Sequence, residues 1–167
     1  SNHNIIDHLT FDLYRGEKIA VVISAMGKTT NALERLLHAY FYHTNLLEEE
    51  FNSIRDYHFK TIGDLFPDRN HEVYGDVAGV FTSLKSWLEN PPSDNYDYEY
   101  DQIVSLGEII STKIVSAYLN MSDMENLWID ARNIIRTDNT YRDARIDWDK
   151  TSELVKNLMK FHREKIY

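Results

Sequence analysis

The stretch KIAVVISAMGKTTNALERLLHAYFY (Lys18–Tyr42) decides the expected fold class of this chain. Its first part, residues 18–24, is rich in Ile and Val without polar alternation, which is typical of a strand buried on both faces. A short loop follows, and residues 31–42 then show helical spacing with leucines on one face. A buried strand that leads through a short loop into a helix predicts an α/β fold.

Helical spacing of apolar residues recurs along the rest of the chain. We expect three helices between residues 46 and 88, packed as a lobe over about residues 44–90. The acidic, tyrosine-rich segment NPPSDNYDYEYD (Asn90–Asp101) carries two prolines and is predicted to be a loop. The other predicted elements are helices over residues 4–14, 103–120 and 150–165, a short strand over 127–131, and irregular structure over 133–149.

Two strands are too few for a sheet whose parallel strands are joined through helices. We therefore expect the remaining strands of the sheet to lie outside this sequence. The hydrophobic edge that their absence would expose would allow the chain to form a homodimer.

Composition limits the classes of function. The chain has 167 residues, a single-domain length, and a net charge of −9, which disfavours nucleic acid and anionic membranes as partners. It lacks cysteine, so disulfides and thiolate metal sites are excluded. Its longest apolar run is far shorter than the ~18–20 residues of a membrane span. The seven histidines show no metal-ligand spacing, so we predict no metal site and expect them at surface or edge positions.

Gly27, Lys28 and Thr29 follow the predicted strand and open a helix, which invites comparison with a phosphate-binding P-loop. That motif needs a glycine five residues before its second one, and Val22 stands there instead. The simpler interpretation is a polar turn in which the hydroxyl of Thr29 or Thr30 caps the helix. The exposed amides of such a turn would still favour an anion such as a carboxylate.

Small polar residues mark one side of the predicted 103–120 helix, around Glu108. Its neighbour Gly107 would cost ~1 kcal/mol relative to alanine inside a helix, and such a glycine usually marks close approach by backbone or ligand. A carboxylate at this place could bind the ammonium group of an amino acid. The alternative is an ordinary glutamate favoured by the helix dipole.

Four arginines follow the second predicted strand. A bidentate arginine is the usual partner of a carboxylate. Most of the four are nevertheless expected to pair on the surface with downstream aspartates, namely Asp138, Asp143, Asp147 and Asp149. They are Arg132, Arg136, Arg142 and Arg145.

Three segments together resemble the amino-acid substrate half of the aspartate kinases, in the amino-acid kinase family. VVISAMGKTTNALE (Val21–Glu34) is similar to a strand and loop with the words V-V-S-A and T-N-x-L. SLGE (Ser105–Glu108) is similar to the S-x-G-E helix start, and DARNIIRTDNTYRDARID (Asp130–Asp147) to a stretch containing T-D-x-x-F/Y. The resemblance implies a three-layer α/β/α fold of the carbamate kinase type, incomplete and helix-rich over residues 1–167.

By this resemblance, Thr30 and Glu108 would contact the substrate L-aspartate, and Ser24 would line the mouth of the site. The arginine that grips the substrate carboxylate in some members would align with Asp143, so Arg142 is the candidate that could replace it. The family's phosphate-binding K-F-G-G loop and G-G-S-D stretch have no match here. We therefore expect a partial catalytic domain, without the nucleotide-binding part, catalytic residues or the regulatory domain.

The implied activity is transfer of the γ-phosphoryl group of ATP to the side-chain carboxylate of L-aspartate, with Mg²⁺, by a cytoplasmic enzyme of lysine, threonine and methionine biosynthesis. The chain alone is expected to be inactive. Another amino-acid kinase acting on a carboxylate or carbamate, a helical interaction module without activity, and a P-loop nucleotide binder that depends on Lys28 are the alternatives.

Overall fold

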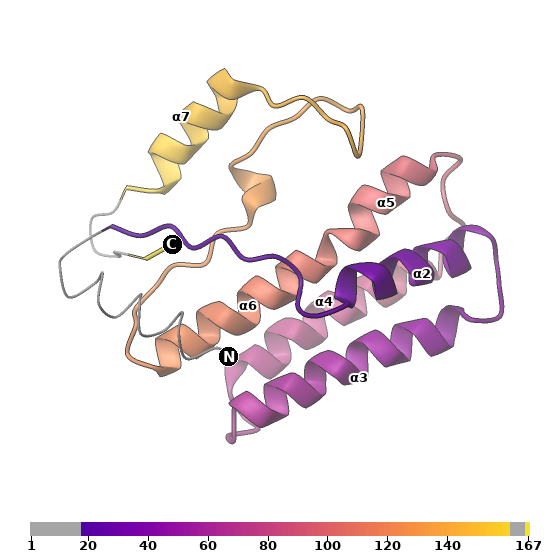
Figure 1. The fold of residues 1–167 in the computed structure, drawn as a ribbon, viewed down its shortest axis with the longest axis horizontal. Coiled ribbons are helices and arrows are strands. Elements are labelled where there is room, and N and C mark those ends of the chain that lie inside the picture. The colour runs from indigo at the N-terminus through magenta and orange to yellow at the C-terminus, as the bar shows by residue number, and fades with distance from the viewer. Residues whose placement is uncertain (1–17, 161–165) are drawn as a thin grey trace. The chain divides into compact units, whose positions relative to one another are not determined.

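The computed structural model describes residues 18–160 and 166–167, and these residues are predominantly helical (Figure 1). The predicted helix over residues 4–14 lies outside them. None of the described helices is long and apolar enough to cross a bilayer. In chain order the elements are α2 (Thr29–Phe41), α3 (Leu47–Leu65), α4 (Glu72–Leu88), α5 (Tyr96–Val104), α6 (Leu106–Met121), the 3-10 helix η1 (Ala131–Asn133) and α7 (Trp148–Leu158).

The chain divides into two compact units. The first, which we call the helical unit, contains residues 23–114 and 141–143, and the second contains the described parts of residues 1–22, 115–140 and 144–167. Helix α6 contributes residues to both units.

Within the helical unit, α2 packs against α3 and α5, and α3 packs against α4 (Figure 1). Burial of one apolar stripe from each helix drives this packing. The predicted leucine face of α2 is confirmed, because Leu33, Leu36 and Leu37 are fully buried. Facing helices supply the rest of the core, including Ile54, Ile62, Val77, Phe81, Ile103 and Ile110.

Two predicted boundaries in this unit are wrong. The lobe contains two helices rather than three, because α4 continues through Gly75 instead of ending there. The acidic segment is not wholly a loop, because α5 begins at Tyr96 behind the cap residue Asn95, whose side chain accepts from the Tyr98 amide at 3.0 Å.

The long helix predicted over residues 103–120 is instead two helices that meet at Ser105. The Ser105 hydroxyl donates to the Asp101 carbonyl at 2.7 Å, a local bond that competes with regular helix structure. Gly107 follows directly, and its low helix propensity adds to the tendency to break there.

In the second unit, three extended segments meet through isolated parallel bridges at Ile166. Ile166 pairs with Ile19 and with Asn126. The Val21 amide donates to the Tyr167 carbonyl at 2.8 Å, and the Tyr167 amide donates to the Ile19 carbonyl at 3.0 Å. Beneath them lies a small buried cluster of Leu119, Met124 and Ile166.

These bridges replace the strands predicted over residues 18–24 and 127–131. No strand occurs in residues 18–160 or 166–167, because each extended segment finds a backbone partner over only one or two residues. Val22, predicted to be buried on both faces, is 96% exposed. The three-layer α/β/α architecture is therefore not confirmed in the described residues, which are helix-rich.

The end of the chain differs from the prediction in length. Helix α7 starts at Trp148 behind Asp147, whose side chain accepts from the Lys150 amide, and it ends at Leu158 rather than at residue 165. Residues 161–165 lie outside the described residues. The segment 133–149 is mostly irregular as predicted, but it includes the end of η1, an antiparallel bridge between Thr137 and Ile146, and the first two residues of α7.

Candidate functional site

The loop that leads into α2 has a left-handed turn at Gly27, where φ is +56°. A side chain there would be strained by its conformation, and its Cβ would lie 2.8 Å from the Tyr57 hydroxyl. The Thr29 amide donates to the Met26 carbonyl at 3.0 Å. The predicted hydroxyl cap is wrong, because the cap residue is Lys28 and no side chain caps the helix.

This loop lies directly against the start of α6 within the helical unit. A Cβ on Gly107 would lie 2.9 Å from the Ala25 Cβ and 3.3 Å from the Thr29 methyl group. Real Cβ atoms essentially never approach as closely as the first of these distances. The predicted close approach at Gly107 is confirmed, but the approaching atoms belong to side chains and not to backbone or a ligand. Only a residue without a side chain lets them come this near.

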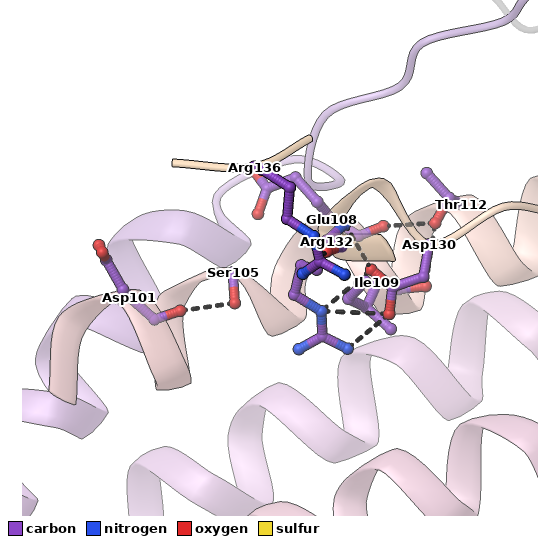
Figure 2. Close-up of polar contacts among 8 residues, drawn as sticks. All are labelled: Asp101, Ser105, Glu108, Ile109, Thr112, Asp130, Arg132 and Arg136. Carbon is purple, nitrogen blue, oxygen red and sulfur yellow. Dashed lines mark hydrogen bonds and ion pairs between the residues drawn. The ribbon is translucent and has the colours of Figure 1, made fainter. Parts of the chain in front are cut away.

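Glu108 is the next residue, in the first turn of α6, and its side chain turns toward the same loop. Its Oε1 atom accepts a hydrogen bond from the Ala25 amide at 3.3 Å, and the residue is half-buried. Its backbone carbonyl accepts from the Thr112 hydroxyl at 2.8 Å (Figure 2). The carboxylate is therefore held at the loop from one side while its position remains partly open to solvent.

The structure brings three of the four predicted site residues to this junction. Thr30 is half-buried and follows Thr29 in the first turn of α2, and Ser24 is exposed and precedes Ala25. They adjoin in sequence the two loop residues that contact α6, since Ala25 bonds to Glu108 and Thr29 approaches Gly107. Ser111, one turn further along α6, is fully buried, and its hydroxyl has no hydrogen-bond partner among the described residues.

Arg142 lies elsewhere in the helical unit, against α5. Tyr141 and Arg142 both have left-handed backbone conformations. The Arg142 guanidinium lies 4.2 Å from the ring centre of Tyr100 and 3.3 Å from an oxygen of Asp97, whose hydrogen bond raises the pKa of Arg142. Its amide also donates to the Asp101 carboxylate at 3.2 Å. These contacts are with α5 and not with Glu108.

A pocket of about 470 Å³ opens beside this arginine, and its wall includes Asn31, Glu34, Arg35, His38, Tyr96, Tyr100 and Arg142. The pocket's charged groups are mostly paired with one another or with neighbours. The Tyr100 hydroxyl donates to Glu34 at 2.7 Å, and Arg35 pairs with Glu50 at 2.8 Å.

The segment after the second predicted strand belongs to the second unit. The Asp130 side chain accepts from the Arg132 amide at 2.9 Å and forms an ion pair with the Arg132 guanidinium at 2.7 Å (Figure 2). Arg136 donates to the Arg132 carbonyl at 3.3 Å. The partner of Arg132 is thus an acid two residues before it and not one of the downstream aspartates.

The sequence interpretation missed His58, which is fully buried instead of lying at a surface or edge. Its Nδ1 atom bonds to the Ile54 carbonyl at 2.8 Å, and its Nε2 atom lies 3.4 Å from the Thr29 hydroxyl. Burial lowers the pKa of His58. The signal was present, since Ile54, His58 and Ile62 recur every four residues on the buried face of α3.

Comparisons with known proteins agree with this architecture. The family model described as Amino acid kinase family matches residues 3–166. The chain is 26% identical over 142 residues to the bifunctional aspartokinase/homoserine dehydrogenase 2 of Escherichia coli K12, which covers 85% of this chain and 17% of that protein.

Two crystal structures of E. coli aspartokinase III share its fold at 21% identity. One is a complex with aspartate and ADP in the R-state, with a TM-score of 0.77 over 95% of this chain and 36% of that chain. The other is a complex with lysine and aspartate in the T-state, with a TM-score of 0.76 over 92% and 34%. The predicted similarity to aspartate kinases is confirmed, and the chain spans about a third or less of the length of these relatives.

Proposed function

The chain belongs to the amino acid kinase family, and from this we propose that it forms the amino-acid-binding part of an aspartate kinase. Family membership and the aspartokinase relatives support a kinase function. The complete enzyme would transfer the γ-phosphoryl group of ATP to the side-chain carboxylate of L-aspartate and produce 4-phospho-L-aspartate and ADP.

The contact between Glu108 and the Ala25 amide carries the proposal. It holds a half-buried carboxylate at a loop-to-helix junction, and the loop that donates this bond carries Ser24 directly before Ala25 and leads to Thr30 in the first turn of α2. A carboxylate attracts the ammonium group of an amino acid, and ion pairs gain strength as water is removed from them. We assign the ammonium to Glu108 and polar contacts with the substrate to Thr30.

The chemistry does not require a general base. The side-chain carboxyl of aspartate has a pKa of about 3.9, so it is already an anion at neutral pH. One of its oxygens forms the new bond to the γ-phosphorus, and the bond from that phosphorus to the bridging oxygen breaks as ADP leaves. Catalysis then depends on alignment and on neutralising the phosphoryl charge.

The described residues contain no group of three or more His, Asp or Glu side chains that could hold a metal ion. We assign the contacts to ATP and Mg²⁺ to other parts of the enzyme on a separate ground, because the family's phosphate-binding K-F-G-G loop and G-G-S-D stretch have no match in this sequence. This division leaves the described residues with the task of binding and orienting the amino acid.

The assignment of Arg142 as the clamp on the substrate carboxylate is harder to support. Its guanidinium is engaged with Tyr100 and Asp97, and its loop is held on Asp101. A role in substrate binding would require Arg142 to leave these partners.

The test is a phosphoryl-transfer assay of the complete protein that carries this chain, with ATP, Mg²⁺ and L-aspartate, and with the acyl phosphate trapped as hydroxamate. We expect aspartate-dependent product, and we expect Glu108→Ala to raise the KM for aspartate strongly while the KM for ATP stays nearly constant.

Glu48→Ala is the matched control, because Glu48 is exposed in the first turn of α3 and should leave both constants unchanged. Absence of product from the folded protein would refute the kinase assignment. An unchanged KM for aspartate in Glu108→Ala would refute the role of this residue.

A further inference from the structure

His58 and Thr29 form a buried polar contact between α3 and the start of α2. His58 is fully buried and Thr29 is 3% exposed. The His58 ring also packs near Tyr57, with ring centres 5.2 Å apart, and near Phe81 from α4, with ring centres 5.9 Å apart. A polar pair in such surroundings is costly to bury unless each member satisfies the other.

The hydrogen bonds fix which ring nitrogen of His58 carries the proton. The Ile54 carbonyl can only accept, so the Nδ1 atom at 2.8 Å from it must be the donor. In the neutral ring the Nε2 atom is then an acceptor, and the Thr29 hydroxyl donates to it. Protonation of the ring would turn Nε2 into a donor, reverse the direction of its bond to the Thr29 hydroxyl and place a positive charge in buried surroundings.

Thr29 is also, with Leu33, a residue through which α2 contacts the start of α6. Its methyl group lies 3.3 Å from the place where a Cβ of Gly107 would be. Thr30 follows Thr29 in the same helical turn, and Glu108 follows Gly107. His58 is therefore linked to Thr30 through Thr29, and to Glu108 through Thr29 and Gly107.

We propose that His58 is a positioning residue for the amino-acid site: in its neutral form it holds Thr29 through Nε2 and so keeps the adjacent Thr30, and the contact of Thr29 with the start of α6, in place. The proposal rests on the proposed function, because it concerns the same site. His58 does not contact the substrate in this scheme, and its role is to fix the start of α2.

A dependence on pH follows from the surroundings of the ring. The groups that face it are Thr29 from α2, Phe81 from α4, and Ile54 and Tyr57 from its own helix. None of these carries a negative charge at neutral pH, so nothing in this set compensates a protonated ring. Burial lowers the pKa of His58 from its ordinary value of 6.5. Acidification to a pH below this lowered pKa would protonate the ring. The buried charge would loosen the start of α2 and weaken aspartate binding.

The experiment measures the KM for aspartate and kcat of the complete protein across the acidic pH range for three variants. His58→Leu removes the acceptor and Thr29→Val removes the donor at nearly constant volume. The loss of one buried hydrogen bond should raise the KM for aspartate about 3- to 10-fold in each, with a smaller change in kcat. The double variant should be no worse than either single one, because both remove the same contact.

His58→Gln tests the mechanism by rescue. Its amide can donate to the Ile54 carbonyl and accept from Thr29 but cannot titrate, so it should recover most of the affinity and reduce the loss at acidic pH. Thr82→Val is the control for the threonine substitution, since the Thr82 hydroxyl only bonds to the Ala78 carbonyl in α4.

Nitrogen NMR of His58 gives a readout independent of activity, and we expect a neutral ring with the proton on Nδ1 at pH 7. A ring that titrates at an ordinary pKa, or an unchanged KM in both His58→Leu and Thr29→Val, would overturn the proposal. If Glu108→Ala raises the KM but these variants do not, only the role of His58 fails. If no variant, including Glu108→Ala, changes the KM, the assignment of the site itself fails.

Discussion

Gly107→Ala tests whether the loop and α6 are as close as the structure places them. A methyl group at this position would lie 2.9 Å from the Ala25 Cβ, 3.2 Å from the Leu33 Cδ1 atom and 3.3 Å from the Thr29 methyl group. Leu33 is fully buried, and Ala25 carries the amide that holds Glu108, so neither can move without consequence.

The magnitude follows from two opposing effects. Alanine is preferred to glycine in a helix interior by about 0.8–1.0 kcal/mol, and the gain is smaller at the second residue of α6. An extra methyl group in a well-packed region costs about 1–3 kcal/mol. We therefore expect Gly107→Ala to lower the free energy of unfolding by about 1 kcal/mol.

Gly79→Ala provides the matched control, because Gly79 lies inside α4 and a Cβ there would meet nothing within 4 Å. This variant should raise the free energy of unfolding by up to about 1 kcal/mol. Urea denaturation of both variants measures the difference between them, which isolates the steric effect at Gly107. A Gly107→Ala protein as stable as Gly79→Ala would refute the close packing of the loop on α6.

Two further predictions concern hydrogen-bonded side chains elsewhere in the helical unit. Glu99 is buried, and its two oxygens accept from the Trp87 indole at 2.8 Å and the Ser93 amide at 2.7 Å. Glu99→Gln turns one of the two acceptors into an NH₂ group that faces a donor. The free energy of unfolding, measured in urea, should therefore fall by about 1–3 kcal/mol. An unchanged free energy of unfolding would contradict this geometry. The hydrogen bond from Tyr100 to Glu34 raises the pKa of the Tyr100 phenol above its ordinary value of 10.0, and Glu34→Gln should lower it in an ultraviolet titration against pH.

The sequence was a good guide where a local pattern is enough to specify the structure. The leucine face of α2 and the close approach at Gly107 both follow from residue type and spacing, and both are confirmed. The break at Ser105 was missed because the apolar pattern continues across it.

The strands were mispredicted for a different reason. Residues 18–24 have strand-like composition, but a strand needs partners along its length, and composition does not say where those partners are. In the described residues this segment bonds to residues 166–167 over a short stretch only, and Val22 stays exposed. The position of His58 was also missed, since its partner Thr29 is 29 residues away.

Glu99 and Glu108 show why contacts, more than residue type, separate structural carboxylates from candidate binding groups. Glu99 is 2% exposed and both of its oxygens are satisfied by short hydrogen bonds from the protein, so it cannot accept a ligand without leaving Trp87 and Ser93 unpaired. Glu108 is half-buried, and its single side-chain bond to a described residue is a long one, 3.3 Å, to the Ala25 amide. That bond orients one oxygen and leaves capacity for a further donor, as an ammonium group requires. Both residues lie in the first turn of a helix, so the helix dipole favours a carboxylate at either position. Their capacity to bind a ligand differs because donors among the described residues satisfy both oxygens of Glu99 but only one oxygen of Glu108.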